Sequence, residues 1–309
     1  MDILSIGEPL MELSDVVDKE RRRVYLPGFG GDTSNFAVAA ARQGAKVGYL
    51  TRVGMDTFGD NFLHLWRNEG IDVSLVQRDA ESHTGMYFIT YTEKGHEFTY
   101  MRKGSAASKL KPEDIKEDDI SRFRLLHVSG ISQAISDTAC DAIFKAIEIA
   151  KSKGIIISYD PNLRLKLWPI ARARAVILST AVQTDIFMPS LEDSQQLLNI
   201  NDPTQIVDHY LGLGIRMVVL KLGKQGVLIA DATNRNYVDG FEVETIDATG
   251  AGDTFDGAFC AQVLNNVPLE YSAKYANAAA ALSTKGHGAV TPIPFRITVE
   301  DFLQIKHTP

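Results

Sequence analysis

Short apolar segments alternate with longer amphipathic segments along most of the chain, and this pattern limits the possible folds more than any other feature. The apolar segments predict strands at Asp2–Ile6, Val47–Val53, Leu125–Ser129, Ile155–Tyr159, Asp185–Met188 and Met217–Leu222. The segments between them predict helices at Phe36–Gln43, Asp60–Asn68, Asp137–Lys153 and Thr204–Leu211, the first capped by Thr33 or Ser34. Because the strands lack polar alternation, both faces of their sheet should be covered. We therefore predict an α/β fold, with a doubly wound, mainly parallel sheet and helices on both faces.

Two segments interrupt this alternation. Residues 8–25 are polar and irregular, whereas residues 84–102 alternate around a turn at Glu93–Gly95 and predict a β-hairpin. The side chains expected on one face of the hairpin are Met86, Phe88 and Thr90, and those on the other are Tyr87, Ile89 and Tyr91. Together the segments predict a small antiparallel sheet, a lid formed by about residues 8–30 and 84–104. Since no Pro- or Gly-rich linker occurs, we expect residues 1–309 to form a single domain.

The charge balance narrows the class of partner. The chain has 309 residues, with 32 Lys and Arg against 39 Asp and Glu, and a net charge of −7. Nucleic acid and anionic membranes attract positive surfaces, so we expect neither as a partner. At 45% hydrophobic residues, the composition is typical of a globular protein and excludes disorder as the main state. Such an acidic chain needs local donors to bind a small anion.

The cysteines and the N-terminal segment point to a cytoplasmic protein. The two cysteines, Cys140 and Cys260, exclude a disulfide framework and favour a reducing compartment. The opening MDILSIGEPL reads as a strand and not as a signal peptide, since it has no basic segment. No run of 18 apolar residues occurs, so no membrane span is expected.

Several common catalytic motifs are absent. The chain has no G-x-x-x-x-G-K-[ST], G-x-G-x-x-G, H-E-x-x-H, G-x-S-x-G or C-x-x-C. Walker-type NTPases, dinucleotide oxidoreductases, zincins, α/β-hydrolases and paired-cysteine sites therefore lose support.

The most informative motif is Asp247–Asp253, which leads into a helical segment at Thr254–Leu264. The small residues Gly250, Ala251 and Gly252 lie where the helix begins, so their backbone amides should be unpaired and point toward one position. With the helix dipole, these amides form a candidate anion hole that needs no basic side chain.

Asp253 follows directly in this anion site. A carboxylate there repels a phosphate, so helix capping is the simpler explanation of it. The preceding glycines favour a catalytic role, in which Asp253 accepts the proton of an attacking hydroxyl. Since phosphoryl transfer passes through a loose transition state, a weak base suffices. The motif therefore predicts phosphoryl transfer to an alcohol.

Three motifs together resemble those of the ribokinase-like (PfkB) carbohydrate kinases, and the resemblance covers essentially the whole chain. They are D-A-T-G-A-G-D at Asp247–Asp253, G-G-D-T-S-N at Gly30–Asn35 and K-L-G-K-Q-G at Lys221–Gly226. The resemblance implies a doubly wound core with a β-lid, ATP as donor and Mg²⁺ to neutralise its phosphates. It also implies that Asp253 is the base and that the amides of residues 250–252 are the anion hole.

The nucleotide-binding residues implied by the resemblance are Asn162, Lys221, Gly223, Gly226 and Asn277. The glycines also fit a turn between strands, and Asn277 also fits a solvated helix position. The loop Lys285–Gly288, with Asp247 and Thr249, is a candidate site for K⁺. The family's Asn-x-x-Glu is replaced here by Ser190–Asp193, so no metal ligand is assigned.

Two further stretches resemble the 2-keto-3-deoxygluconate kinases within this family. They are Y-M-R-K-G-S-A-A at Tyr100–Ala107 and D-P-N-L-R-L-K-L-W at Asp160–Trp168, and Met101 stands where a second tyrosine is frequent. The sugar-binding residues implied are Gly31, Asn35, Tyr87, Tyr100, Arg102 and Arg164. Two arginines suit a sugar acid, because guanidinium groups bind carboxylates in a bidentate manner. Arg164 has the alternatives of binding ATP only or pairing with an acidic neighbour.

The function expected is ATP-dependent phosphorylation of the terminal (C6) hydroxyl of 2-keto-3-deoxygluconate, a small-molecule sugar acid. The nearest alternative is a fructokinase or another neutral-sugar kinase of the same family, since D-P-N-x-R also occurs in fructokinases. An alternative of another class is a non-catalytic sugar-sensing module, although a binder has no need of a base. An oxidoreductase would need the dinucleotide fingerprint that is absent. The exposed lid predicts a homo-oligomer that forms through it.

Overall fold

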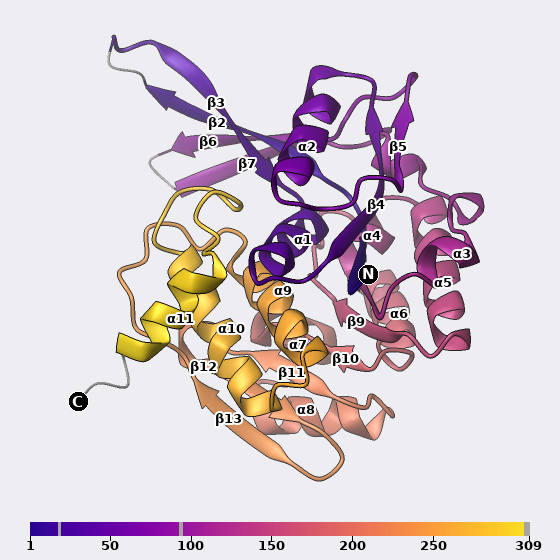
Figure 1. The fold of residues 1–309 in the computed structure, drawn as a ribbon, viewed down its shortest axis with the longest axis vertical. Helices are drawn as coiled ribbons and strands as arrows, with labels where there is room; N and C mark the ends of the chain where they lie inside the picture. The colour runs from indigo at the N-terminus through magenta and orange to yellow at the C-terminus, as the bar shows by residue number, and fades with distance from the viewer. Residues whose placement is uncertain (18–19, 93–94, 306–309) are drawn as a thin grey trace.

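The computed structural model describes residues 1–17, 20–92 and 95–305. Its main sheet has the strand order β13-β12-β11-β10-β9-β8-β1-β4-β5 (Figure 1). The strands are β1 (Ile3–Ile6), β4 (Val47–Gly54), β5 (Val76–Asp79), β8 (Leu125–Ser129), β9 (Ile156–Asp160), β10 (Ile186–Phe187), β11 (Val218–Lys221), β12 (Gly226–Ala230) and β13 (Arg235–Asp239). All neighbours from β5 to β11 pair in parallel, and β12 and β13 add an antiparallel edge. The predicted doubly wound, mainly parallel sheet is confirmed.

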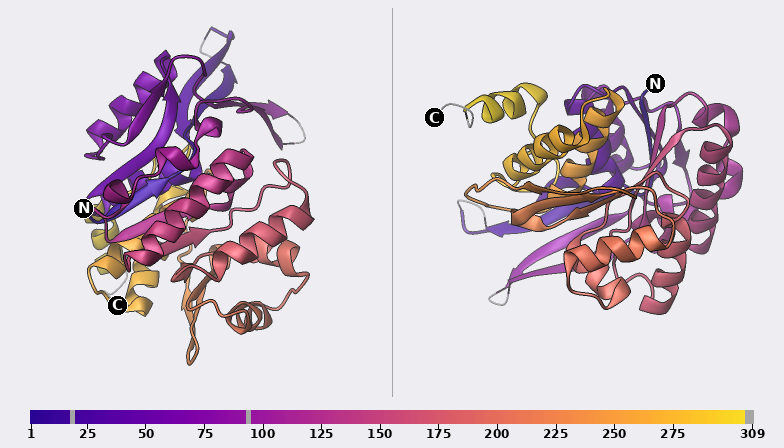
Figure 2. Two further views of the ribbon diagram at one scale, coloured as in Figure 1. Left: turned by 90° about the vertical axis from the view of Figure 1, so that its right-hand side faces the viewer. Right: turned by 90° about the horizontal axis from the view of Figure 1, so that it is seen from below.

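Helices cover both faces of this sheet (Figure 2). Those whose apolar side chains join one core cluster are α5 (Asp137–Ser152), α6 (Ile170–Ala181), α7 (Leu191–Leu198) and α8 (Pro203–Gly212). Those that join the other are α1 (Asp32–Arg42), α2 (Thr57–Asn68), α9 (Ala251–Leu264), α10 (Leu269–Ser283) and α11 (Arg296–Ile305). The short elements are α3 (Glu117–Ile120), α4 (Gly130–Ala134), and the 3₁₀ turns η1 (Ala107–Lys109), η2 (Pro112–Asp114) and η3 (Gly223–Gln225).

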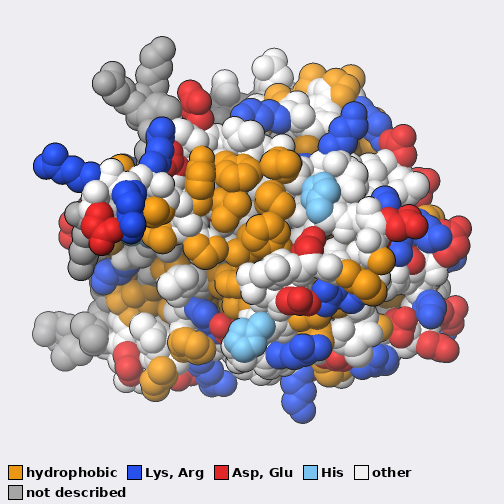
Figure 3. Space-filling model, turned by 90° about the horizontal axis from the view of Figure 1, so that it is seen from above, with side chains coloured by type: hydrophobic (Ala, Val, Ile, Leu, Met, Phe, Trp, Pro, Cys, Tyr) orange, Lys and Arg blue, Asp and Glu red, His pale blue; other side chains and the backbone are white. Residues whose placement is uncertain are grey.

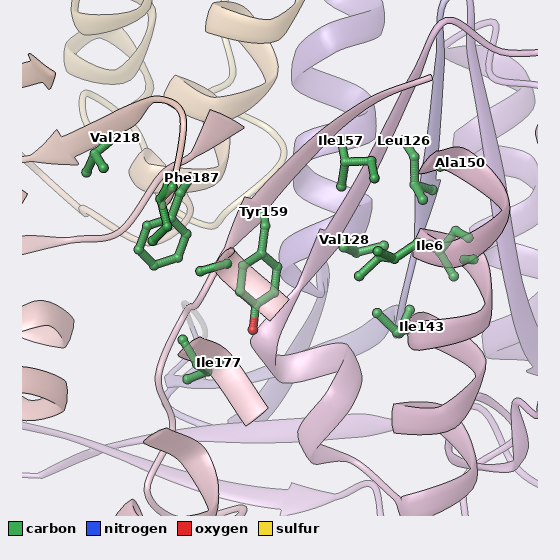
Figure 4. Close-up of a cluster of buried hydrophobic side chains, with 14 of the residues drawn as sticks. Ile6, Leu126, Val128, Ile143, Ala150, Ile157, Tyr159, Ile177, Phe187 and Val218 are labelled. Carbon is green, nitrogen blue, oxygen red and sulfur yellow. The ribbon is translucent and has the colours of Figure 1, made fainter. Parts of the chain in front are cut away.

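The core beneath the sheet is built from apolar side chains of the parallel strands. Figure 4 shows Ile6, Val128 and Ile157 from three adjacent strands, which face Ile143 of α5. Fully burying such a side chain contributes about 1.5–3 kcal/mol, so this layer holds the strand ends in fixed positions. Tyr159 is buried among them, and its hydroxyl donates to Gln133 Oε1 at 2.7 Å.

A second sheet stands away from the core as a lid (Figures 1 and 2). Its order is β3-β2-β6-β7, with β2 (Leu10–Val17), β3 (Arg23–Gly30), β6 (Met86–Thr92) and β7 (Gly95–Met101). The irregular segment predicted at 8–25 is therefore mostly strand. The two hairpins are antiparallel, but β2 and β6 pair in parallel, so the predicted all-antiparallel sheet is wrong at its centre. The reason is that both hairpins leave the same end of the parallel sheet, after β1 and after β5.

The expected side-chain alternation in β6 is confirmed where it is described, because Tyr87 and Ile89 are buried whereas Met86, Phe88 and Thr90 are half-buried. The predicted turn at Glu93–Gly95 and the side chain of Tyr91 lie outside the described residues.

Two helix starts differ from expectation. Helix α1 begins at Asp32 with Gly31 as N-cap, so Thr33 and Ser34 lie inside it and do not cap it. Their hydroxyls bond instead to Tyr49 and Trp66, at 2.9 and 3.0 Å. Helix α2 begins at Thr57 because Asp56 accepts a bond from the amide of Gly59 at 2.8 Å. Among the described residues, no helix has the length and apolarity that crossing a membrane requires.

Candidate active site

The carboxyl ends of β1, β8 and β9 meet where the strand order reverses, which is where α/β sheets usually bind ligands. Chain order runs from β1 outward to β4 and β5 and then returns to β8 on the other side of β1. The residues at or just beyond these strand ends are Glu8, Ser129 and Asp160. The first turns of α1 and α9 and the base of the lid complete this region.

The first turn of α9 holds the residues that are predicted to form the anion site. Gly250 is its N-cap with φ of +76°, and a Cβ there would lie 3.0 Å from the carbonyl oxygen of Ala289, so the position requires glycine. Within the described chain, the amides of Gly250 and Gly252 have no hydrogen-bond partner. The Ala251 amide donates to the carbonyl of Ala248 at 3.2 Å, and the role of the amides of residues 250–252 as an anion hole stays a prediction. The tight turn before the helix uses that amide.

Asp253 occupies the third position of α9. The helix has no side-chain cap, so the capping explanation of Asp253 is excluded. Its Oδ2 accepts a hydrogen bond from Asn35 Nδ2 at 2.8 Å, which brings together two residues from motifs far apart in sequence. Burial and the nearby negative charge of Asp32 raise the pKa of Asp253 to about 7. A general base with a pKa near neutrality is well matched to proton transfer at neutral pH.

A buried ion-pair group, the lysine cluster, lies beside this turn and consists of Lys221, Asp160 and Asp256. Lys221 Nζ donates to Asp160 Oδ2 at 3.0 Å and to Asp256 at 2.9 and 3.1 Å. A Cβ added to Gly252 would lie 3.7 Å from the same Nζ. Although burial opposes it, pairing with both carboxylates raises the pKa of Lys221 well above its ordinary value. The ammonium is thus directed at two carboxylates.

The loop after β9 carries two more of the predicted site residues, Asn162 and Arg164. Asn162 has φ of +35°, its amide donates to Asp160 Oδ1 at 3.0 Å and its Nδ2 donates to Asp32 Oδ2 at 3.2 Å. Arg164 is exposed and donates to the carbonyl of Leu163 at 2.9 Å. Burial and the charge of Asp160 raise the pKa of Asp193 to about 6, and Asp193 accepts a bond from the Leu163 amide at 3.1 Å. Asp193 therefore holds this loop in place.

The base of the lid brings together several of the residues that are predicted to bind the sugar. Arg102 Nη2 donates to Glu8 Oε2 in a buried ion pair, and Ser105 donates to Glu8 Oε1 at 3.1 Å. Arg102 also lies over the ring of Tyr100, 5.4 Å from its centroid. Burial raises the pKa of Glu8, although Arg102 opposes the shift. Tyr87 donates to Glu12 Oε2, so its hydroxyl already has a protein acceptor.

Gly31 shapes the entry to α1. It has φ of +97°, and a Cβ there would lie 2.3 Å from the carbonyl oxygen of Glu8. Only glycine fits this close approach of two backbone segments. The position predicted to bind sugar therefore also joins β3 to α1.

The remaining residues that are predicted to bind the nucleotide lie around η3. Gly223 and Gly226 have φ of +60° and +101°, and a Cβ on Gly226 would lie 2.1 Å from the carbonyl oxygen of Val238, so the turn explanation holds for both glycines. Asn277 is buried, and its Nδ2 donates to the carbonyls of Val238 and Asp239 at 3.1 and 3.0 Å. Asn277 is thus not a solvated helix position.

The candidate K⁺ residues are brought together. The Thr249 amide and hydroxyl donate to Asp247 Oδ1 at 2.9 and 2.7 Å, and the Gly288 amide donates to Oδ2 at 2.9 Å. Burial alone would raise the pKa of Asp247, but these donors outweigh it and hold the pKa below its ordinary value.

Four acidic residues of the site were not predicted as site residues from the sequence. They are Glu8, Asp32, Asp160 and Asp256. Asp32 and Asp160 lie inside motifs used for the resemblance, but no spacing rule separates them from other polar motif residues. Glu8 lies in a segment that appears irregular in sequence. Its only signal is an acid directly after an apolar strand.

The arrangement combines a base, free helix-terminal amides and a lid. Asp253 can accept a proton from a hydroxyl bound beneath the lid. The amides of Gly250 and Gly252 can bind an anionic group beside it. These are the parts that phosphoryl transfer to an alcohol requires.

Comparisons with known proteins agree with this chemistry. The profile described as pfkB family carbohydrate kinase matches residues 1–296. A 2-dehydro-3-deoxygluconokinase from Thermoproteus tenax is 34% identical, and the match covers 98% of this chain and 94% of that protein. A probable fructokinase-4 from Arabidopsis thaliana is 30% identical over 98% of this chain and 96% of that protein. A crystal structure from E. coli, described as a putative Ribokinase II in complex with ATP and Mg²⁺, superposes with a TM-score of 0.91 at 29% identity, covering 98% and 99% of the two chains.

Proposed function

Because the chain belongs to the pfkB family of carbohydrate kinases and is therefore a sugar kinase, we propose that its acceptor is 2-keto-3-deoxygluconate. In this proposal, ATP phosphorylates the terminal C6 hydroxyl of the acid sugar. Relatives described as 2-dehydro-3-deoxygluconokinase, the same activity, are 34% and 32% identical to this chain. Fructokinases at about 30% identity support fructose as the alternative acceptor.

One observation carries the choice of a sugar acid. Arg102 lies at the base of the lid, and within the described residues its buried Nε has no hydrogen-bond partner. Glu8 fixes the guanidinium through Nη2, so the remaining N–H groups keep a defined direction. A buried donor without a partner is costly, and an acceptor carboxylate would satisfy it. A neutral sugar offers only weaker acceptors.

The proton transfer follows from the position of Asp253. The C6 hydroxyl attacks the γ-phosphorus, the bond from that phosphorus to the β,γ-bridging oxygen breaks, and the products are the sugar phosphate and ADP. Asp253 takes the hydroxyl proton. The free amides of Gly250 and Gly252 bind the oxygens of the transferred group, where charge is spread in the transition state. The lid excludes water and so suppresses ATP hydrolysis.

The residues of the site fit ATP, Mg²⁺ and K⁺ to different degrees. The turn at Gly250 offers the amides that a phosphate needs, and in this proposal Asn162, Gly223, Gly226 and Asn277 lie along the nucleotide. The ammonium of Lys221 is already paired with Asp160 and Asp256. Among the described residues, no group of three His, Cys, Asp or Glu is arranged to hold a metal ion. Mg²⁺ often binds mainly through substrate phosphates and water, so we place it on the nucleotide and assign it no side chain. When bound, it neutralises phosphate charge. A K⁺ ion near Asp247 and Thr249 stays a prediction.

A panel of acceptors tests the proposal. ADP formation is measured with 2-keto-3-deoxygluconate, fructose, ribose and gluconate, and the phosphorylated carbon is identified by ³¹P-coupled NMR. The proposal predicts the highest kcat/KM with 2-keto-3-deoxygluconate and transfer to C6. A higher kcat/KM with fructose would establish the neutral-sugar alternative. Sugar binding without ADP formation would establish the sensing module.

The outer face of the lid supports a homo-oligomer. By the strand register, this face carries Leu13, Tyr25, Pro27, Phe88 and Met101. Tyr25 and Met101 are each 52% exposed, and Figure 3 shows an apolar area on the upper side of the molecule. Such a patch on an otherwise charged surface favours self-association. Light scattering of the wild type and of Tyr25→Glu would show a dimer that the substitution dissociates.

A further inference from the structure

The C-terminal end of α1 carries a largely buried arginine that bonds to two other parts of the chain. Arg42 lies in the last turn of this helix, and its side chain is 9% exposed. Its Nε and Nη2 atoms donate to the two carboxylate oxygens of Glu69, the residue after α2, at 3.0 and 2.7 Å. Such a bidentate pair fixes the plane of the guanidinium. The remaining nitrogen, Nη1, therefore has a defined direction.

That nitrogen points into the segment between α10 and α11. Residues 284–295, the α10–α11 loop, form neither helix nor strand. Nη1 donates to three carbonyls of this loop, those of Val290, Thr291 and Ile293, at 3.1, 3.4 and 2.5 Å. The guanidinium also lies over the ring of Phe295, 4.7 Å from its centroid. Because the carbonyls of an irregular segment need partners as much as those of a helix, Arg42 holds this loop in one conformation.

The beginning of the same loop lies against the turn before α9. The Gly288 amide donates to Asp247 Oδ2 at 2.9 Å. The next residue, Ala289, is 2% exposed and packs on Gly250, where an added Cβ would lie 3.0 Å from the Ala289 carbonyl oxygen. Such close packing leaves neither segment room to move alone. The α10–α11 loop is thus one wall of the turn that offers the free amides.

Helix α1 therefore reaches the start of α9 in two ways. Near its N-terminus, Asn35 donates to Asp253 at 2.8 Å. Arg42 is seven positions further on, which is about two helical turns, so both side chains lie on one face of α1. Between them the two helices pack closely (Figure 1), since a Cβ added to Gly257 of α9 would lie 2.6 Å from the backbone of α1. The helix contacts Asp253 directly and Gly250 through the loop.

We propose that Arg42 is a positioning residue for phosphoryl transfer. It holds the α10–α11 loop against residues 247–250 and so keeps the amides of Gly250 and Gly252 directed at the transferred phosphoryl group. This inference rests on the proposed role of those amides and does not depend on which sugar is the acceptor. Arg42 acts through the loop and is assigned no contact with either substrate.

A simpler explanation is that Arg42 only stabilises the packing of α1. Arg124 provides the comparison, because it donates to the carbonyl of Leu264 at 2.9 Å and lies 3.5 Å from the carboxylate of Asp2. It thus joins a carbonyl and a carboxylate as Arg42 does, but at the opposite end of α9. Arg124→Ala is therefore the control for the loss of such an arginine away from the site.

Steady-state kinetics, measured well below the melting temperature of each variant, tests the proposal. Arg42→Ala should lower kcat about ten- to a hundredfold, because small displacements of a catalytic geometry have effects of up to this size. The acceptor KM should change little, and the loss in kcat should be the same with every sugar that is accepted. Arg42→Lys keeps the charge without the planar fork and should recover part of the loss. Arg124→Ala should keep the wild-type kcat.

Hydrogen exchange supplies a readout that is separate from activity. In Arg42→Ala, the amides of residues 286–293 and those of residues 247–254 should both exchange faster than in the wild type. The amides of residues 258–264, further along α9, should keep their protection. Faster exchange of the loop alone would show that the loop does not hold the turn, and the inference would be overturned.

The failure of this inference differs from the failure of the proposed function. The acceptor panel on the wild type decides the function, whereas the ratio of variant to wild type with any accepted sugar decides the inference. If the wild type binds sugar without forming ADP, the function fails and hydrogen exchange alone tests the coupling.

Three kinetic results would overturn the inference. They are a wild-type kcat in folded Arg42→Ala, an equal loss in Arg124→Ala, and a loss confined to the acceptor KM. If Arg42→Ala does not fold, Arg42→Lys and Glu69→Gln take its place, since the second weakens the anchor of the guanidinium. A wild-type kcat in both of these variants overturns the inference as well.

Discussion

Two buried charged groups meet at the first turns of α9 and differ in how completely their hydrogen bonds are satisfied. In the lysine cluster, one ammonium meets two carboxylates at 2.9–3.1 Å. In the other group, Asn35 donates to Asp253, and within the described residues the buried Oδ1 atoms of Asp32 and Asn35 have no hydrogen-bond partner. A satisfied buried network holds elements together, whereas an unsatisfied one is suited to a ligand. The comparison assigns the lysine cluster to scaffolding and the other group to chemistry.

The strongest test of this comparison is the removal of Asp253, the proposed general base. Asp253→Ala should lower kcat by about 10²–10⁴, the usual contribution of a general base, with a smaller change in acceptor KM. Steady-state kinetics with saturating ATP measures both. Asp253→Asn keeps the shape and the contact with Asn35 and should lose as much activity. Near-normal turnover in either variant would remove Asp253 from the mechanism.

The lysine cluster should respond in stability. Lys221→Met leaves Asp160 and Asp256 buried without a counter-charge, so the free energy of unfolding should fall by about 3–5 kcal/mol in chemical denaturation. Adding Asp256→Asn to this variant should restore part of the loss, because one uncompensated charge is removed. If Lys221→Met is as stable as the wild type and only its KM for ATP rises, the lysine acts on the nucleotide and the comparison breaks.

Arg102 tests the ligand side more finely. Arg102→Ala should weaken binding of 2-keto-3-deoxygluconate by ~1.5–3 kcal/mol, the scale of a hydrogen bond to a charged group. Arg102→Lys keeps the charge but loses the planar fork and should recover only part of this binding. The inhibition constant of fructose, measured for the wild type and for each variant, provides the control. An equal loss of fructose binding would rule out the carboxylate contact.

The smallest expected effect is a shift in pH dependence. Wild-type kcat/KM should rise with pH through about 7, where Asp253 ionises. Asn35 stabilises the charged form of Asp253, so Asn35→Ala should raise that pKa and move the acidic limb to higher pH, by about one unit. A limb that does not move would show that another group controls the profile.

The sequence predicts the parallel core and the start of α9 well because both depend on local patterns. The apolar strands leave no polar face, and Gly250–Asp253 combines small residues with a helix start. What the sequence does not predict is the contact between segments that are distant in the chain. That β2 pairs with β6 in parallel follows from chain directions that no local pattern contains.

The roles of Glu8 and Asp256 were equally inaccessible. A buried acid is recognised by its partner, and their partners Arg102 and Lys221 are distant in sequence. In contrast, the contact between Asn35 and Asp253 joins two motifs that were both identified, although only the structure shows that they touch.

The parallel pairing at the centre of the lid also affects how the chain folds. It joins Met11 to Met86, whereas β1 reaches its neighbour β4 through a shorter loop, from Ile3 to Val47. Closing a longer loop costs more entropy, and distant pairings form slowly. The two halves of the lid should therefore join only after the strands between them have docked. In a nascent chain, helix α1 would therefore form before the lid over the sugar is complete.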